Sequence, residues 1–243
     1  LKEIFKNQPT TVEFRKSDLT TGVELDGATL TVLDKDGNEI DKWTSVKGEP
    51  HIIKRLHVGE TYILREEFAP YGYLKAEEVE FTITDTAEIQ KVEMKDDVPI
   101  GRIIINKKGE FLSEVTWNEM VAGAMDSIWD YVTGSLKDVT FEIYAREDIK
   151  AADGESDDYY KKDELVATIK TDELGIARTD DLPLGKYYVV EKETADGFVL
   201  DGEPRDIDLT YRDQDTPVVT FDSEWQNSRQ KAKVIVTKKE KDS

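Results

Sequence analysis

A lysine, a glutamate and an aspartate or asparagine occur twice along this chain, each in a stretch where apolar residues alternate with polar ones. Side chains two residues apart on a β-strand point to the same face of a sheet, so these polar residues should point into the core. Burying unpaired charges costs several kcal/mol each, and the groups must therefore neutralise one another. The six residues are Lys16, Glu66 and Asp96, then Lys107, Glu191 and Asn227.

Two arrangements would satisfy such groups: a buried, hydrogen-bonded ion pair, or a covalent bond between the lysine and the last residue of each set. Desolvation lowers the pKa of a buried lysine toward a neutral nucleophile and raises that of a buried glutamate toward a neutral acid. The amine would then attack the side-chain carbonyl of Asp96 or Asn227, while Glu66 or Glu191 protonates the oxygen and shuttles protons to the departing water or ammonia. The residues alone leave both arrangements open.

Alternation does not select every residue uniquely. Glu193 has the same parity as Glu191, and Glu67, Asp97 and Lys108 are immediate neighbours of other candidates. Parity alone leaves both Glu191 and Glu193 open.

The elements that position these residues form two copies of one pattern. In both copies an alternating strand with the lysine comes first, a second strand follows, the glutamate ends a strand before a glycine-containing turn, and one more strand closes the copy. The matched segments are TVEFRKSD (11–18) with GRIIINKKG (101–109), LDGATLTVLD (25–34) with LKDVTFEIYA (136–145), and YILREEFAPYGY (62–73) with YVVEKETADGF (188–198); the closing strands lie at 92–97 and 218–227.

About seven short strands per copy, separated by turns such as KDGN, predict an all-β chain of two tandem immunoglobulin-like sandwiches. We expect the first domain at 9–98 and the second at 99–230. Segments 1–8 and 231–243 are interpreted as the tail of a preceding repeat and the start of a following one, or as linkers, because both carry fragments of the same pattern.

The second copy has an insertion between its first two strands. From Trp117 to Val132 apolar residues fall at helical spacing, which predicts an inserted amphipathic helix near 114–133. Such a helix is expected either to cover a sheet edge or to bind a ligand. A second excursion, 152–164, is predicted to be an exposed loop. Its acidic residues offer oxygen ligands for Ca²⁺, but their spacing matches no EF-hand, and we expect no metal and no cofactor.

Composition excludes several classes of protein. The net charge of −20 would repel nucleic acid and anionic membrane surfaces, so neither is an expected partner. With no cysteine, disulfides and thiol chemistry are excluded, and the two histidines, His51 and His57, are interpreted as ordinary strand or loop residues. No apolar stretch reaches the length of a membrane helix, so membrane insertion is not expected.

Taken together, VEFRKSD, LDGATLTV and EEFAPYGY in the first copy, with LPLGKYYVVEKETADGF and WQNSRQK in the second, resemble the B-type repeat domains of Gram-positive collagen adhesins and the related pilin shaft domains. The resemblance covers nearly the whole chain. It implies intramolecular isopeptide bonds, with Lys16 joined to Asp96 and Lys107 to Asn227, and with Glu66 and Glu191 as catalysts. The first copy departs from the commoner pattern by carrying aspartate where asparagine is usual.

The resemblance further implies an extracellular, cell-wall-anchored surface protein in which this chain is a structural stalk segment, with neighbouring repeats of the same polypeptide as its partners. It would not be an enzyme beyond a single autocatalytic turnover. The alternative is a module that binds a host protein or glycan through the insertion or a loop, for which exposed Trp117 and Trp129 would be evidence. A glycosidase with paired carboxylates is a third reading, disfavoured because no further inward pair of acids stands out.

Overall fold

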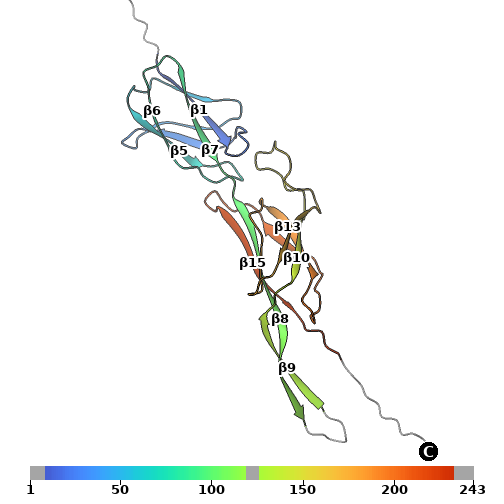
Figure 1. Ribbon diagram of the computed structural model, residues 1–243. Coiled ribbons are helices and arrows are strands. Elements are labelled where there is room, and N and C mark those ends of the chain that lie inside the picture. Colours follow the sequence, from blue (N-terminus) through green and yellow to red (C-terminus); the bar gives the residue numbers. More distant parts are fainter. Residues whose placement is uncertain (1–8, 119–125, 233–243) are drawn as a thin grey trace, which may run out of the picture.

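The computed structural model describes residues 9–118 and 126–232. Over these ranges the chain is all-β, with fifteen strands and no helix. Figure 1 shows two domains placed end to end, the first built from β1 to β7 and the second from β8 to β15. The prediction of an all-β chain with two domains is confirmed.

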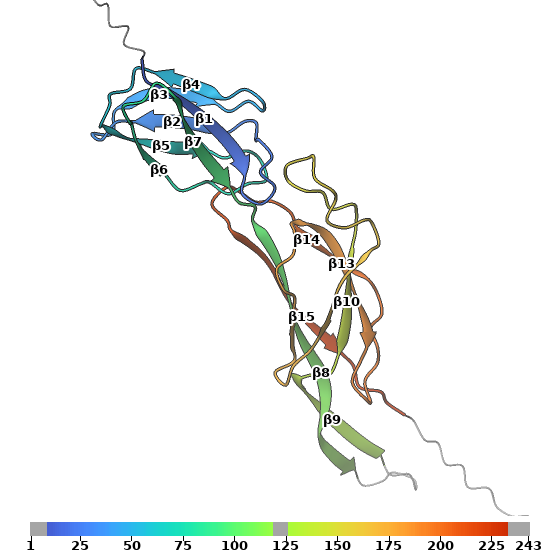
Figure 2. The ribbon, with the colours of Figure 1, turned by 45° about the horizontal axis from the view of Figure 1, so that its top comes forward.

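The first domain is a sandwich of two sheets (Figure 2). One sheet has the order β4-β1-β7 and the other β3-β2-β5-β6. Apolar side chains from the inner faces, among them Phe14, Leu30, Leu64 and Met94, form one buried cluster between the sheets. The strands are β1 (Thr11–Asp18), β2 (Thr29–Leu33), β3 (Glu39–Thr44), β4 (His51–Lys54), β5 (Thr61–Phe68), β6 (Val79–Thr82) and β7 (Ile89–Asp96).

The second domain repeats this plan. One sheet has the order β12-β8-β15, with β9 also paired to β8, and the other has the order β11-β10-β13-β14. Its core includes Ile103, Phe141, Val189 and Trp225. The strands are β8 (Ile100–Asn118), β9 (Asp126–Ser135), β10 (Thr140–Ala145), β11 (Leu165–Lys170), β12 (Ile176–Arg178), β13 (Gly185–Glu193), β14 (Arg205–Leu209) and β15 (Val218–Asn227).

The first and last strands of each domain are parallel neighbours. In the first domain β1 pairs with β7 from Thr11 opposite Ile89 to Asp18 opposite Asp96. In the second, β8 pairs with β15 from Ile100 opposite Val218 to Gly109 opposite Asn227. Because the strands are parallel, the chain enters each domain at one end of this pair and leaves at the other.

The predicted inserted helix is wrong. The described part of the segment forms a β-hairpin in which the far half of β8 pairs with β9, for example Val115 with Trp129. This hairpin projects beyond the second sandwich (Figure 1). Trp117, Val121, Met125 and Trp129 are spaced by four, and because four is a multiple of two, the same spacing also fits one face of a strand. Residues 119–125, which were part of the predicted helix, lie outside the described ranges.

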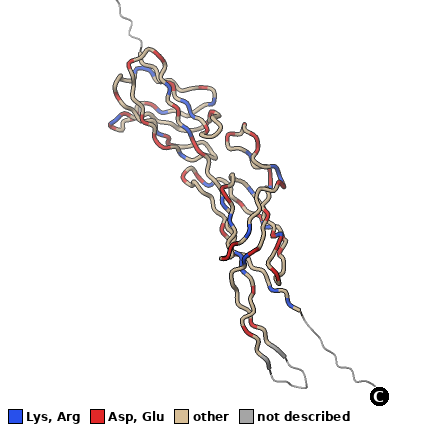
Figure 3. Tube along the Cα trace, in the orientation of Figure 1, with Lys and Arg blue, Asp and Glu red and all other residues tan. Residues whose placement is uncertain are grey.

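The excursion at 152–164 is a loop of turns and bends, as predicted. It lies next to the first domain, where Lys47 forms an ion pair with Glu155. Among the described residues, no helix is long and apolar enough to cross a membrane. Acidic and basic residues are interspersed along both domains (Figure 3).

Candidate crosslinking sites

The first site lies between the two sheets of the first domain. Lys16 comes from β1, Glu66 from β5 and Asp96 from β7, and all three are buried, with relative exposures of 3%, 0% and 0%. Each is on an inward-facing position, as strand alternation predicts. The sandwich therefore brings together three residues that are far apart in sequence, with Lys16 and Asp96 separated by 80 positions.

The lysine amine contacts both acids of this site. Lys16 Nζ lies 2.9 Å from Glu66 Oε1 and donates a hydrogen bond to Asp96 Oδ1. The second oxygen of Glu66, Oε2, accepts a hydrogen bond of 2.7 Å from the backbone N–H of Ala76. Glu66 is thus held with one oxygen on the loop after β5 and the other on the amine.

The protonation of Asp96 suits an acyl acceptor. Burial destabilises its charged form and, despite the opposing effect of Lys16, raises the pKa of Asp96 to about 7. Its Oδ2 atom is buried without a hydrogen-bond partner among the described residues. A substantial fraction of Asp96 is therefore neutral near neutral pH, and a neutral carboxyl is far more reactive toward an amine than a carboxylate is.

The second site has the same plan. Lys107 on β8, Glu191 on β13 and Asn227 on β15 are buried, with relative exposures of 1%, 3% and 1%. Lys107 Nζ donates a hydrogen bond of 2.6 Å to Glu191 Oε2, and Asn227 Nδ2 donates one of 2.5 Å to Glu191 Oε1. The glutamate therefore lies between the amine and the amide, in contact with both.

Apolar surroundings act on the amine of the second site. The Phe141 ring centroid lies 5.6 Å from Lys107 Nζ. Burial lowers the pKa of Lys107, although its ion pair with Glu191 opposes this effect. The neutral, nucleophilic form of Lys107 is thus more populated than that of an exposed lysine.

The neighbouring candidates differ in burial. Glu193 is exposed, whereas Glu191 is buried. The two residues lie two positions apart but differ in burial because the pairing of β10 with β13 shifts register between them. Thr140 lies opposite Glu193, and Phe141 lies opposite Glu191. Asp97 is likewise exposed, and Glu67 and Lys108 are only partly buried.

Two contributors to the sites were missed at the level of sequence. Thr194 Oγ1 accepts a hydrogen bond of 2.8 Å from Asn227 Nδ2, and the backbone N–H of Ala76 holds Glu66. Thr194 follows the irregular end of β13, so alternation gives no signal for it. A backbone donor such as Ala76 leaves no trace in residue type.

Within the described ranges, no group of three or more histidine, aspartate or glutamate side chains is arranged to hold a metal ion. The acids of the 152–164 loop bond to their own turn instead, with Asp153 accepting hydrogen bonds from the backbone of Glu155 and Ser156.

The chain therefore consists of two tandem sandwich domains, each with one buried site of the same plan. A model of the SpaA family, described as a prealbumin-like fold domain, matches residues 10–98 and 129–225. The chain belongs to this family and contains two such domains. This confirms, at the level of the family, the resemblance to adhesin repeats and pilin shaft domains that the sequence motifs carry.

Solved structures with a similar fold come from Gram-positive bacteria. The Bacillus anthracis TIE protein is 23% identical, with a TM-score of 0.55, over 91% of this chain and 34% of that one, so the chain spans about a third of that protein's length. The minor pilin GBS52 of Streptococcus agalactiae is 12% identical over 94% of this chain and all of that one, with a TM-score of 0.36. The major pilin subunit BcpA of Bacillus cereus is 12% identical over 92% of this chain and all of that one, with a TM-score of 0.35. No curated protein sequence matches the chain significantly.

Proposed function

We propose that the chain is a stalk segment of a Gram-positive cell-surface protein, and that each of its domains is closed by an autocatalytic isopeptide bond. The observation that carries this proposal is a buried glutamate that contacts a lysine amine of the first strand in both domains. In the first domain the amine also contacts the acceptor Asp96, and in the second Glu191 joins the amine to the acceptor Asn227. Membership of the SpaA family supports the structural role.

In the first domain, the neutral amine of Lys16 attacks Cγ of neutral Asp96. A C–N bond forms and the C–OH bond of the carboxyl breaks. Glu66, which lies 2.9 Å from the amine, takes a proton from the nitrogen and returns it to the leaving hydroxyl, which departs as water. The product is an uncharged amide, so the cost of keeping charges in the core disappears.

In the second domain, Lys107 attacks Cγ of Asn227 and the C–NH₂ bond breaks. Glu191 contacts both nitrogen atoms and passes the proton lost by the amine to the departing group, which leaves as ammonia. Thr194 holds the amide in place during the attack. Each reaction occurs once per molecule, so the chain is not an enzyme with an external substrate.

The parallel strands give the bonds a mechanical role. Tension that enters at Thr11 would run along β1 to Lys16, cross the amide to Asp96 and leave directly toward β8. The strands between β1 and β7 would lie outside this path and bear no load. The same holds for Lys107 on β8 and Asn227 on β15. This geometry supports a stalk that holds a distal part of a larger surface protein away from the cell wall, with neighbouring repeats as its partners.

Intact-mass measurement of the purified chain tests the proposal. The measured mass should fall below the sequence mass by one water and one ammonia. Replacing Lys16 by methionine should restore the water alone, and replacing Lys107 by methionine should restore the ammonia alone. A wild-type mass equal to that of the sequence would contradict both crosslinks.

A second candidate is a binding module that uses the β8–β9 hairpin. Apolar side chains on the hairpin are about half exposed: Leu112, Ile128, Trp129 and Val132 at 42%, 49%, 51% and 55%. The side chain of Trp117 lies outside the described structure. Binding to purified host matrix proteins and glycans that is lost in an Ile128→Ser, Val132→Ser variant would support this role. Equal behaviour of variant and wild type would refute it.

A further inference from the structure

The junction between the domains is built around one turn of the second domain. Residues 211–214, just after β14, contact the loop that follows β5 in the first domain. Gln214 Oε1 accepts a hydrogen bond of 2.9 Å from the N–H of Ala69, and the backbone oxygen of Gln214 accepts one of 3.0 Å from Lys75. Tyr211 Oη donates a hydrogen bond of 3.0 Å to the backbone oxygen of Tyr73.

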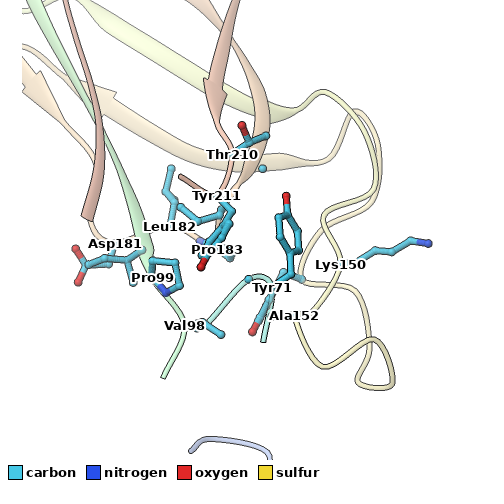
Figure 4. A pocket seen from close by; sticks show the side chains of 15 residues that line it. Tyr71, Val98, Pro99, Lys150, Ala152, Asp181, Leu182, Pro183, Thr210 and Tyr211 are labelled. Carbon is cyan, nitrogen blue, oxygen red and sulfur yellow. The ribbon is translucent and has the colours of Figure 1, made fainter. Parts of the chain in front are cut away.

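An aromatic contact adds to these hydrogen bonds. The rings of Tyr71 and Tyr211 meet edge to face, with centroids 4.9 Å apart. Both tyrosines line a pocket of about 350 Å³, together with Val98 and Pro99 of the connection between the domains. Figure 4 shows these side chains. The loop after β5 is therefore attached to the second domain at several points along its length.

The same loop holds the catalytic carboxyl of the first site. The N–H of Ala76 donates to Glu66 Oε2, which leaves Oε1 facing Lys16. Within the loop, Tyr73 is buried and its hydroxyl donates a hydrogen bond of 2.8 Å to Asp18 on β1. The orientation of Glu66 thus depends on a loop whose conformation is fixed from one side by Asp18 and from the other by residues 211–214.

The corresponding loop of the second domain is fixed differently. It bonds to the chain that leaves its own domain: the N–H of Val199 donates to Ser228, and that of Gln230 donates to Gly197. Among residues 9–118 and 126–232, only the loop of the first site is contacted by another domain.

We propose that docking of residues 211–214 positions Glu66, so that the Lys16–Asp96 bond forms at full rate only after the second domain has folded. Gln214 is a positioning residue in this account. The inference rests on the proposed crosslinks and adds an order to them: the second domain completes its bond independently, and the first follows.

The two leaving groups allow both reactions to be followed in one molecule. Full-length chain recovered unfolded from inclusion bodies would be refolded by dilution, quenched with acid at intervals and weighed intact. Gln214→Ala should slow the loss of water by about tenfold, the effect of removing one well-placed hydrogen bond, and leave the loss of ammonia unchanged. Gln214→Glu keeps a side-chain oxygen for the N–H of Ala69 but loses the donor to the backbone oxygen of Glu67, and should restore part of the rate.

Two further variants complete the test. Gln230→Ala removes an exposed glutamine side chain at the far end of the second domain and should change neither rate. Tyr211→Phe keeps the ring contact but removes the hydrogen bond to Tyr73, and it should slow water loss even if Gln214→Ala fails to fold. Equal rates of water loss in wild type, Gln214→Ala and Tyr211→Phe would overturn the inference, as would an equal slowing of both losses. Wild-type chain that never loses water would instead contradict the proposed crosslink itself.

Discussion

Asp96 ends β7 and Lys107 lies on β8, the next strand of the chain, so the two proposed crosslinks are joined by one short continuous segment. A load carried from Lys16 to Asp96 would pass along this segment to Lys107 and across to Asn227. The remaining strands of both sandwiches would then carry no tension. The two proposed bonds would therefore act in series along one load path.

The roles of the two glutamates are predicted to be separable. The Glu66→Gln variant should fail to release water from the first site, because glutamine cannot shuttle the proton there, but should still release ammonia from the second. Glu191→Gln should lose water but retain ammonia. Intact mass distinguishes the four combinations. Loss of both small molecules in either variant would show that the glutamate is dispensable.

Above about pH 7, only the second reaction is predicted to accelerate with rising pH. The pKa of Asp96 is about 7, so its reactive neutral form declines above that pH, and water loss should not accelerate with a further rise in pH. Asn227 does not titrate, and the neutral form of Lys107 grows with pH, so ammonia loss should accelerate. Refolding in buffers from mildly acidic to mildly basic, followed by intact mass, measures both. Parallel pH profiles would refute this assignment.

Thr194 is predicted to position Asn227. Thr194→Val removes the oxygen that the amide nitrogen bonds and should slow ammonia loss by about tenfold, while Thr194→Ser should restore it. Water loss from the first domain of the same molecule serves as the internal control. Unchanged ammonia loss in Thr194→Val would assign this threonine no part in the reaction.

Mechanical behaviour should depend on the amide. In single-molecule stretching, the wild-type first domain should not extend, because its load bypasses the strands between Lys16 and Asp96. In the Lys16→Met variant the first domain should unfold under load. The chain between positions 16 and 96, which are 80 residues apart, would then lengthen to roughly 270 Å. The free energy of unfolding of the first domain should also be lower in Lys16→Met, because closing a loop of this length contributes about 4 to 5 kcal/mol. Thermal unfolding measures this difference. A wild-type domain that extends as far as the variant would exclude a load-bearing bond.

Much of both sites could be predicted from sequence because strand alternation is a strong signal where one face is buried. Lys16 and Lys107 follow inward-facing apolar residues, and both are buried. The signal fails where the strand is irregular: Glu193 shares the parity of Glu191 along the chain but is exposed, owing to the shift in pairing near Thr140.

The hairpin and the junction show what sequence could not supply. A spacing of four fits a helix and a strand alike, so the sequence predicts a helix where described residues such as Val115 and Trp129 form a hairpin. The contacts of Gln214 with the loop after β5 join residues of two domains, many of them through backbone atoms. No pattern of residue types reveals such contacts before the domains are placed.

In both proposed sites the buried lysine is covalently bonded to its acceptor. Proteolytic digestion followed by tandem mass spectrometry tests it most directly. We expect two branched products, one joining the peptides of Lys16 and Asp96 and the other those of Lys107 and Asn227, with no linear peptide containing either free lysine. Recovery of Lys16 and Lys107 in ordinary linear peptides would contradict it.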